Sequence, residues 1–217
     1  MYKRQEYGKN EMWYVVDSEP GSYLYCGLSR DASKEEILER INNNTITDIL
    51  NKIEVKAGDV VMVKAGTIHA IGAGVFICEI QQNSNCTYRM YDYDRRDKFG
   101  NPRELHVKKA LDVVDNHKYI KDNKTEVVIA RNEHFTEERL VQCKYFEVYK
   151  YDVNDEAKIT VDEASFVSVL FINGSGTIET DDYEKTMEFK AGDSFFVSAG
   201  LRSIIIKGQA TMVVTRV

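Results

Sequence analysis

The residue best placed for chemistry is His69, which stands in the segment KAGDVVMVKAGTIHAIG at 56–72. Gly58 and Gly66 fall where a barrel chain must turn tightly, because glycine enters positive φ without a steric penalty. Residues 60–63, VVMV, are predicted to form a short buried strand between these turns. A histidine that follows such a turn can point into the mouth of a barrel, where its imidazole is a good metal ligand. The alternative is a structural histidine.

A second copy of the same phrase begins at Lys190. Residues 190–205 are KAGDSFFVSAGLRSII, offset by 190 − 56 = 134 residues, and the position that matches His69 is Ser203. A repeat at this spacing predicts two barrels of one kind, not a solenoid of short units. Because only the first copy keeps the histidine, the first barrel is the candidate for chemistry and the second for support.

Other polar residues share faces of predicted strands. Glu79 and Gln81 stand two residues apart at the end of the apolar strand predicted at 75–80, so their side chains face the same way. Burying such groups without partners is costly, so both need partners. Lys9 stands two residues before Glu11, which opens another predicted strand, and therefore shares its face. The plainer interpretation of Lys9 is a solvated surface lysine.

An arginine lies in a third alternating segment. Residues 87–94, TYRMYDYD, are predicted to form a strand that places Arg89 and two tyrosines on one face. The plainer interpretation is a barrel arginine paired with Asp92 or Asp94. Glu79 would then simply be a partner of Arg89.

Composition excludes several classes of protein. Of 217 residues, 43% are hydrophobic and 29% charged, as in ordinary globular proteins, and the net charge of 29 − 35 = −6 disfavours nucleic acid as a partner. No apolar run approaches the ~20 residues that cross a membrane, so no membrane partner is expected. MYKRQEYGKNE lacks the apolar core of a signal peptide. Four cysteines without C-x-x-C spacing then predict reduced thiols and a cytoplasmic location.

The remaining periodicity predicts a mainly β chain with few helices. Ser33 with Glu36 three residues on is a capping box that opens a helical segment at about 33–50, and 103–115 has the apolar spacing of an amphipathic helix. A turn is predicted at 173–176, NGSG. From about 121 onward the predicted elements are nearly all strands: 127–130, 143–152, 164–172, 187–190, 194–197 and 203–214. We therefore expect two domains, 1–120 and 121–217, with the boundary near 117–124.

Four motifs together resemble one family: GKNEMWY at 8–14, AGTIHAIG at 65–72, EIQQNSNCTYRMYDYDR at 79–95 and RELHVKKALDVV at 103–114. They are similar to type I mannose-6-phosphate isomerase in its small bacterial form, a member of the cupin superfamily. The resemblance runs through essentially the whole chain. It implies two cupin-like β-barrel or jelly-roll domains, the first catalytic and the second without metal ligands. It also implies zinc-assisted interconversion of mannose 6-phosphate and fructose 6-phosphate.

The resemblance assigns roles to five residues. It implies that Glu11 and His69 are zinc ligands. It places Lys9 in the pocket, where it could assist proton transfer, and Glu79 there as a candidate acid or base. Arg89 matches the family's active-site arginine, which could hold the phosphate or stabilise a developing enediolate. These roles stand beside the plainer interpretations given above.

One part of the family's pattern is absent from these 217 residues. The resemblance implies a Gln-x-His ligand pair well upstream of Glu11, but only ten residues precede Glu11 and none is histidine. We therefore expect the first barrel to be incomplete at its start. A missing strand would expose a sheet edge, which predicts a homodimer, poor solubility or a complementing N-terminal polypeptide.

Three functional hypotheses follow. The first is an isomerase that takes a sugar phosphate as its small-molecule substrate and moves a proton through an enediol with the help of zinc. The alternative is a truncated, catalytically inactive cupin that binds a sugar phosphate or serves as a structural or interaction remnant. An effector-sensing module is the least favoured, because no helix-turn-helix or partner domain accompanies the barrels.

Overall fold

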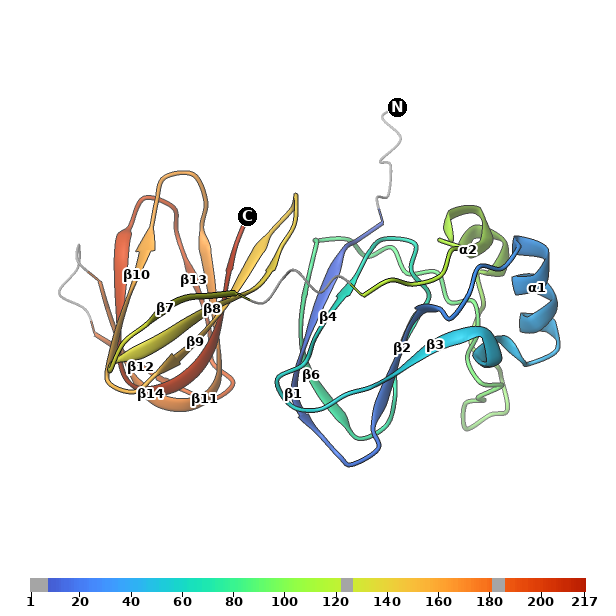
Figure 1. The fold of residues 1–217 in the computed structure, drawn as a ribbon, viewed down its shortest axis with the longest axis horizontal. Helices are drawn as coiled ribbons and strands as arrows, with labels where there is room; N and C mark the ends of the chain where they lie inside the picture. Colours follow the sequence, from blue (N-terminus) through green and yellow to red (C-terminus); the bar gives the residue numbers. More distant parts are fainter. Residues whose placement is uncertain (1–7, 122–126, 181–185) are drawn as a thin grey trace. The chain divides into compact units, whose positions relative to one another are not determined.

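The structure is a computed structural model that describes residues 8–121, 127–180 and 186–217. The chain divides into two compact units, Met1–Lys121 and Asp122–Val217. The predicted mainly β fold is confirmed (Figure 1). Part of the predicted boundary stretch and the first seven residues lie outside the described residues. Among the described residues, no helix is long and apolar enough to cross a membrane.

The first unit contains two small antiparallel sheets. One sheet has the order β4 (Val60–Val63), β1 (Glu11–Ser18) and β6 (Val75–Gln81). The other has the order β3 (Leu50–Glu54), β2 (Tyr23–Leu28) and β5 (His69–Ile71). One apolar cluster joins them, since Trp13 and Val15 of β1 and Leu24 and Cys26 of β2 are all buried in it. The two sheets therefore pack with their inner faces together.

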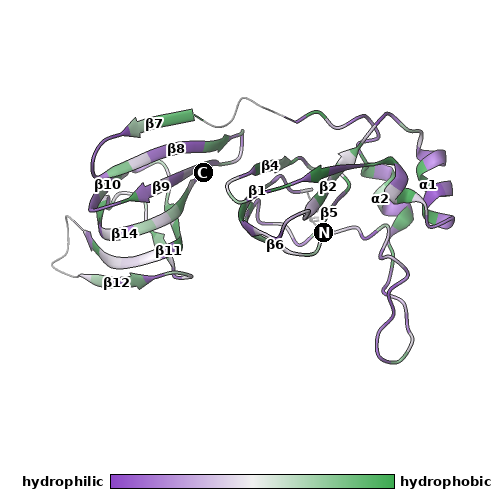
Figure 2. Cartoon of the chain, turned by 60° about the horizontal axis from the view of Figure 1, so that its bottom comes forward, coloured by the Kyte–Doolittle hydropathy of each residue, from purple (hydrophilic) through white to green (hydrophobic). Residues whose placement is uncertain are grey.

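The helices form a second cluster in this unit. They are α1 (Lys34–Asn42), the 3₁₀ turn η1 (Ile46–Ile49) and α2 (Val107–Val113). The predicted helix start is confirmed, because Ser33 Oγ accepts a hydrogen bond from the backbone N–H of Glu36 at 3.1 Å. Figure 2 shows α1 with a hydrophilic and a hydrophobic side. Its apolar residues Ile37 and Ile41 are buried in a cluster that also contains Ala110 of α2.

Two local predictions in this unit are wrong. The helix predicted from 103 begins only at Val107, because the backbone N–H of His106 donates to the carbonyl of Arg89 at 2.6 Å and fixes the preceding chain outside the helix. Residues 87–94 do not form a strand. Tyr93 and Asp94 have φ of 56° and 50°, in the left-handed region, which ends any extended run.

The second unit is one large antiparallel sheet folded on itself (Figure 1). Its main order is β12-β11-β14-β9-β8-β7, with β10 paired to β14 and β13 paired to β11. The strands are β7 (Val127–Arg131), β8 (Phe135–Gln142), β9 (Glu147–Val153), β10 (Glu156–Val161), β11 (Val167–Thr180), β12 (Met187–Lys190), β13 (Ser194–Val197) and β14 (Arg202–Arg216). Strict alternation in β10 buries Ala157, Ile159 and Val161 in the core of this unit.

The prediction of a turn at 173–176 is also wrong. β11 runs through it unbroken, with a shift of register against β14 between Phe171 and Asn173. Gly174 has φ of 89°, and a Cβ there would lie 1.9 Å from the carbonyl oxygen of Gln209. The glycines thus allow an irregularity and a close strand approach, not a chain reversal.

Candidate functional site

The inner faces of the two sheets of the first unit bring four of the predicted residues together. Glu11 opens β1, Lys9 stands two residues before it, and Glu79 stands on the neighbouring β6. His69 opens β5 of the facing sheet, in register with Cys26. Glu11 thus occupies the centre of a small polar cluster at the end of an otherwise apolar interior.

Glu11 is the buried charge of this cluster. Its side chain is only 2% exposed. Oε1 lies 3.1 Å from Lys9 Nζ but outside hydrogen-bond geometry, and it has no hydrogen-bond partner among the described residues. Oε2 lies 3.8 Å from His69 Nε2. Because a buried carboxylate is costly unless cations or donors surround it, this arrangement suits a cation beside Glu11.

The ring of His69 is held with one nitrogen toward Glu11. Its Nδ1 donates to the carbonyl of Thr67 at 2.8 Å, since a carbonyl can only accept. In the neutral ring this leaves the lone pair on Nε2, the nitrogen that faces Glu11. The ring also packs edge-on against Trp13, with 5.3 Å between the ring centroids. Both contacts fix the ring in the orientation that a metal ligand needs.

The turn before His69 depends on a glycine. Gly66 has φ of 88°, and a Cβ there would lie 2.7 Å from the carbonyl oxygen of Val113. The backbone N–H of Thr67 closes the turn onto the carbonyl of Lys64 at 3.0 Å. The Thr67 carbonyl that orients His69 is therefore positioned by this turn, as the glycine spacing in the sequence indicated.

Lys9 and Glu79 complete the cluster. Lys9 Nζ donates to Gln81 Oε1 and lies 4.0 Å from Glu79 Oε1. Burial raises the pKa of Glu79, and the Glu11 carboxylate raises it further, whereas Lys9 and His69 lower it. Glu79 is 36% exposed, so it can exchange protons with a small molecule that enters. Such a carboxyl group is suited to acid–base chemistry.

Gln81 belongs to this cluster although the sequence analysis did not place it among the site residues. It is in register with Glu11 across β1 and β6, and its amide oxygen accepts from Lys9. The signal was the alternation that puts Gln81 on the same face as Glu79. Because Gln81 is predicted to share a face with the candidate acid Glu79, this signal would have placed it among the candidate site residues.

Arg89 has its contacts elsewhere. One guanidinium nitrogen donates to the carbonyl of Glu104 at 3.3 Å, and the backbone N–H donates to Nδ1 of His106 at 3.3 Å. No hydrogen bond or ion pair within the described part of the chain joins Arg89 to Glu11 or Glu79. The long irregular segment after β6 carries it, so alternation could not locate its side chain.

The aspartates proposed as plain partners of Arg89 have other partners. Asp92, 8% exposed at its side chain, pairs with Arg95 and lies 3.6 Å from Arg103. Asp94 pairs with Arg96 at 3.1 Å. These aspartates and their arginine partners all lie in the irregular segment between β6 and α2. The hypothesis of an Arg89–aspartate pair is therefore wrong.

Glu11 and His69 are the two residues that fit a metal ion. The buried carboxylate of Glu11, whose Oε1 has no hydrogen-bond partner among the described residues, and the oriented Nε2 of His69 are ligands that zinc accepts. Over the ranges that the structure describes, no group of three or more His, Cys, Asp and Glu side chains could hold a metal. These residues thus fit part of a ligand set.

Comparison with known proteins agrees with the fold and the motifs. Residues 136–217 match the family model described as mannose-6-phosphate isomerase, cupin domain. The chain is 40% identical to the protein YvyI of Bacillus subtilis over 217 residues, and 32% identical to mannose-6-phosphate isomerase ManA of the same organism over 225 residues. These alignments cover 98% and 99% of this chain but 65% and 66% of the two relatives. The chain thus spans about two thirds of their length.

Solved structures show the same likeness. The crystal structure of the mannose 6-phosphate isomerase from Bacillus subtilis superposes with a TM-score of 0.87 at 36% identity, over 98% of this chain and 66% of that one. A variant of phosphomannose isomerase from Salmonella typhimurium shares the fold, with a TM-score of 0.68 at 12% identity. The match covers 95% of this chain and 67% of that one. The two β units are therefore of the cupin class. Within that class, the chain is similar to mannose-6-phosphate isomerases over nearly its whole length, as its motifs predicted.

Proposed function

We propose that this chain is the part of a mannose-6-phosphate isomerase that supplies a metal-binding glutamate and histidine together with the acid–base residues. The observation that carries the proposal is the convergence of Lys9, Glu11 and Glu79 with His69 at one end of the barrel interior. The relatives named as mannose-6-phosphate isomerases support it. The substrate would be mannose 6-phosphate or fructose 6-phosphate.

Each residue would take a separate part in the isomerisation. Glu11 and His69 would hold zinc, which when bound supplies a Lewis acid to the sugar oxygens. A proton must move between C1 and C2 of the sugar, and Glu79 would hold that proton, since its raised pKa favours the protonated form. Lys9 would stabilise negative charge that develops on the enediol oxygens. The base could equally be Lys9, with Glu79 as the acid.

Arg89 would act on the distant end of the substrate. Its guanidinium has a planar fork that matches a phosphate group. The hydrogen bond to the carbonyl of Glu104 uses one guanidinium nitrogen and does not engage the others. Binding the phosphate would position the sugar at the metal and the acid–base residues. We also propose that further zinc ligands come from outside these 217 residues or from a second copy of the chain.

The second candidate function is a cupin that binds a sugar phosphate without catalysis. It is favoured by one observation, that the described residues contain no cluster of three or more potential metal ligands. A weak metal site would lower the rate of enediol formation without preventing sugar binding. A cytoplasmic location remains a prediction from the cysteine content.

The test is zinc content and isomerase activity of the purified chain, compared with Glu11→Gln. The change removes the buried charge and keeps the shape, so we expect zinc content and turnover of mannose 6-phosphate to fall together. Glu188→Gln, on β12 of the other unit, is the matched control and should change neither. Turnover that survives Glu11→Gln would contradict the proposed role of Glu11 as a metal ligand. Sugar-phosphate binding without turnover in the unaltered chain would favour the second candidate.

A further inference from the structure

The second unit contains a cavity of about 300 Å³ that is separate from the residues of the site described above. Three segments line it: the turn between β8 and β9 at 143–147, the end of β10 with the loop up to the start of β11 at 160–167, and the end of β14 at 216–217. A volume of this size suits a small molecule.

Among the described residues, two cationic side chains line the cavity, and one of them has a buried nitrogen without a hydrogen-bond partner. Lys144 is exposed, with Nζ 5.6 Å from the ring centroid of Tyr145, so the buried group is Arg216. Arg216 Nε is buried and makes no hydrogen bond, and across the described residues no ion pair is formed by its guanidinium. Its one described contact is with the ring of Tyr149, whose centroid lies 5.7 Å from the guanidinium carbon. A partly buried guanidinium without an acceptor is costly, so the geometry favours an anion beside it.

The carboxylates in the cavity wall already accept hydrogen bonds from the protein. Glu147 Oε2 accepts from the hydroxyl of Tyr149 at 2.7 Å, and Oε1 accepts from the side-chain amide of Gln142. Asp162 Oδ1 accepts from two backbone N–H groups of the following loop, at 2.9 and 3.2 Å. Both carboxylates are therefore satisfied as acceptors, whereas the Nε donor of Arg216 has no acceptor among the residues that the structure describes.

An apolar hollow adjoins the cavity. Phe166 and Phe196 stack with 4.9 Å between their ring centroids, and Phe196 is 71% exposed. The hollow that they line shares Ala164, Ser165 and Val217 with the cavity. A ligand whose charged group meets Arg216 can thus place an apolar part on these rings. That favours an organic anion over an inorganic one.

We propose that this cavity is a binding site for a small organic oxyanion, held through its carboxylate or phosphate group by Arg216. The ion pair would use the guanidinium fork, and the apolar part of the ligand would cover Phe166 and Phe196. The site lies wholly within the second unit, so it does not depend on the proposed isomerase activity.

The test is isothermal titration calorimetry of the full chain at low salt with three probes: phenyl phosphate, benzoate and inorganic phosphate. We expect an organic probe to bind more tightly than inorganic phosphate, and Arg216→Gln to weaken it by about tenfold or more, as for a lost charged hydrogen bond. Tighter binding of phenyl phosphate than of benzoate would identify a phosphate ester, and the reverse a carboxylate. Phe196→Ser should weaken the organic probes more than inorganic phosphate.

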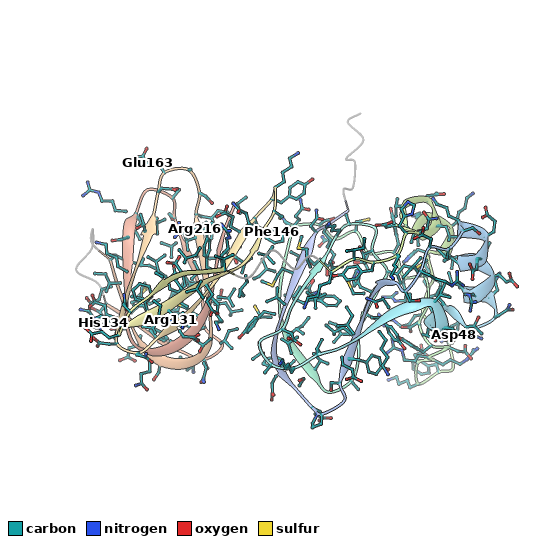
Figure 3. The ribbon with its side chains drawn as sticks, in the orientation of Figure 1. Asp48, Arg131, His134, Phe146, Glu163 and Arg216 are labelled. Atoms are coloured by element: carbon teal, nitrogen blue, oxygen red, sulfur yellow. The ribbon has the colours of Figure 1, made fainter. Side chains whose placement is uncertain are left out.

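Two further variants keep the test decisive. Arg131→Gln is the matched control, because Figure 3 shows Arg131 at the opposite end of this unit from Arg216 and Phe146. If Arg216→Gln does not fold by circular dichroism, Ala164→Phe fills the cavity from its exposed rim with the arginine kept, and should abolish binding. Binding that survives Arg216→Gln or Ala164→Phe would overturn the proposal. Equal loss in Arg131→Gln, or no binding of either organic probe, would do the same.

Discussion

The two copies of the repeated phrase have nearly the same backbone but different surroundings. Asp59 Oδ2 accepts from the backbone N–H of Lys56 at 2.9 Å, and Asp193 Oδ2 accepts from that of Lys190 at the same distance. The following glycine turns also agree, with φ of 88° at one copy and 81° at the other. The local sequence therefore builds the same turn twice.

The difference begins one turn later. His69 opens a strand of three residues and is 34% exposed, with Nε2 toward the buried Glu11. Ser203, its counterpart, is 2% exposed near the start of the 15-residue strand β14. The same turn thus delivers a side chain to an open polar cluster in one barrel and to a closed position in the other. The backbone repeat alone does not make a site.

Removing the histidine should have the largest effect. His69→Ala deletes a proposed ligand, so we expect zinc affinity to fall by at least the ~10–100-fold that changes in outer-shell residues produce. Zinc binding is measured by competition with a chelator. His134→Ala removes an exposed histidine of the second unit, which pairs with Asp155, and should change nothing. Equal zinc affinity in His69→Ala would contradict the proposed role.

Placing a histidine in the second barrel should not create a metal site. Ser203→His puts a ring into a closed position, so we expect a loss of about 1–3 kcal/mol in the free energy of unfolding from overpacking. Urea denaturation measures it. Zinc should not raise the stability of this variant. Stabilisation by zinc would show that the turn and the side chain suffice, and would overturn the distinction between the barrels.

Matched glycine substitutions test how tightly each turn is packed. Both Gly66→Ala and Gly200→Ala place an alanine at positive φ, which costs about 1–2 kcal/mol. A Cβ at Gly66 would also meet the carbonyl of Val113 at 2.7 Å, whereas the nearest atom at Gly200 is Glu163 Cγ at 3.9 Å. Gly66→Ala should therefore cost about 1 kcal/mol more in unfolding free energy. Equal costs in urea denaturation would mean that the first turn can shift freely.

The smallest expected effect concerns the protonation of Glu79. Its pKa is raised in the folded state, so folding favours the protonated form, and this contribution is present below the unfolded pKa and lost as pH rises through the folded pKa. Glu79→Gln should thus gain stability relative to the unaltered chain as pH rises from 4 to 7 in metal-free buffer. Urea denaturation at both pH values checks the sign. A relative loss at pH 7 would mean that Lys9 outweighs burial and Glu11.

Several features of the fold followed from local pattern. The Ser33 cap and the glycine turns at 58 and 66 need only neighbouring residues, and the structure has them as predicted. β10 also alternates strictly, but no strand was predicted there. The irregular segment at 87–94 and the continuous β11 did not follow. At 87–94, residues with left-handed φ break the extended run that alternation predicted. In β11, long-range pairing with β14 outweighs the local turn signal.

By itself the sequence determined the β class, the repeated phrase, the resemblance to mannose-6-phosphate isomerases and the residue types of the candidate site. It also put Lys9 beside Glu11 and Glu79 beside Gln81, because alternation along a strand fixes which side chains share a face. Only the tertiary structure decided that His69, from a facing sheet, meets Glu11, and that Arg216 is left without a partner. These depend on contacts between segments that lie far apart in the sequence, which no local period encodes.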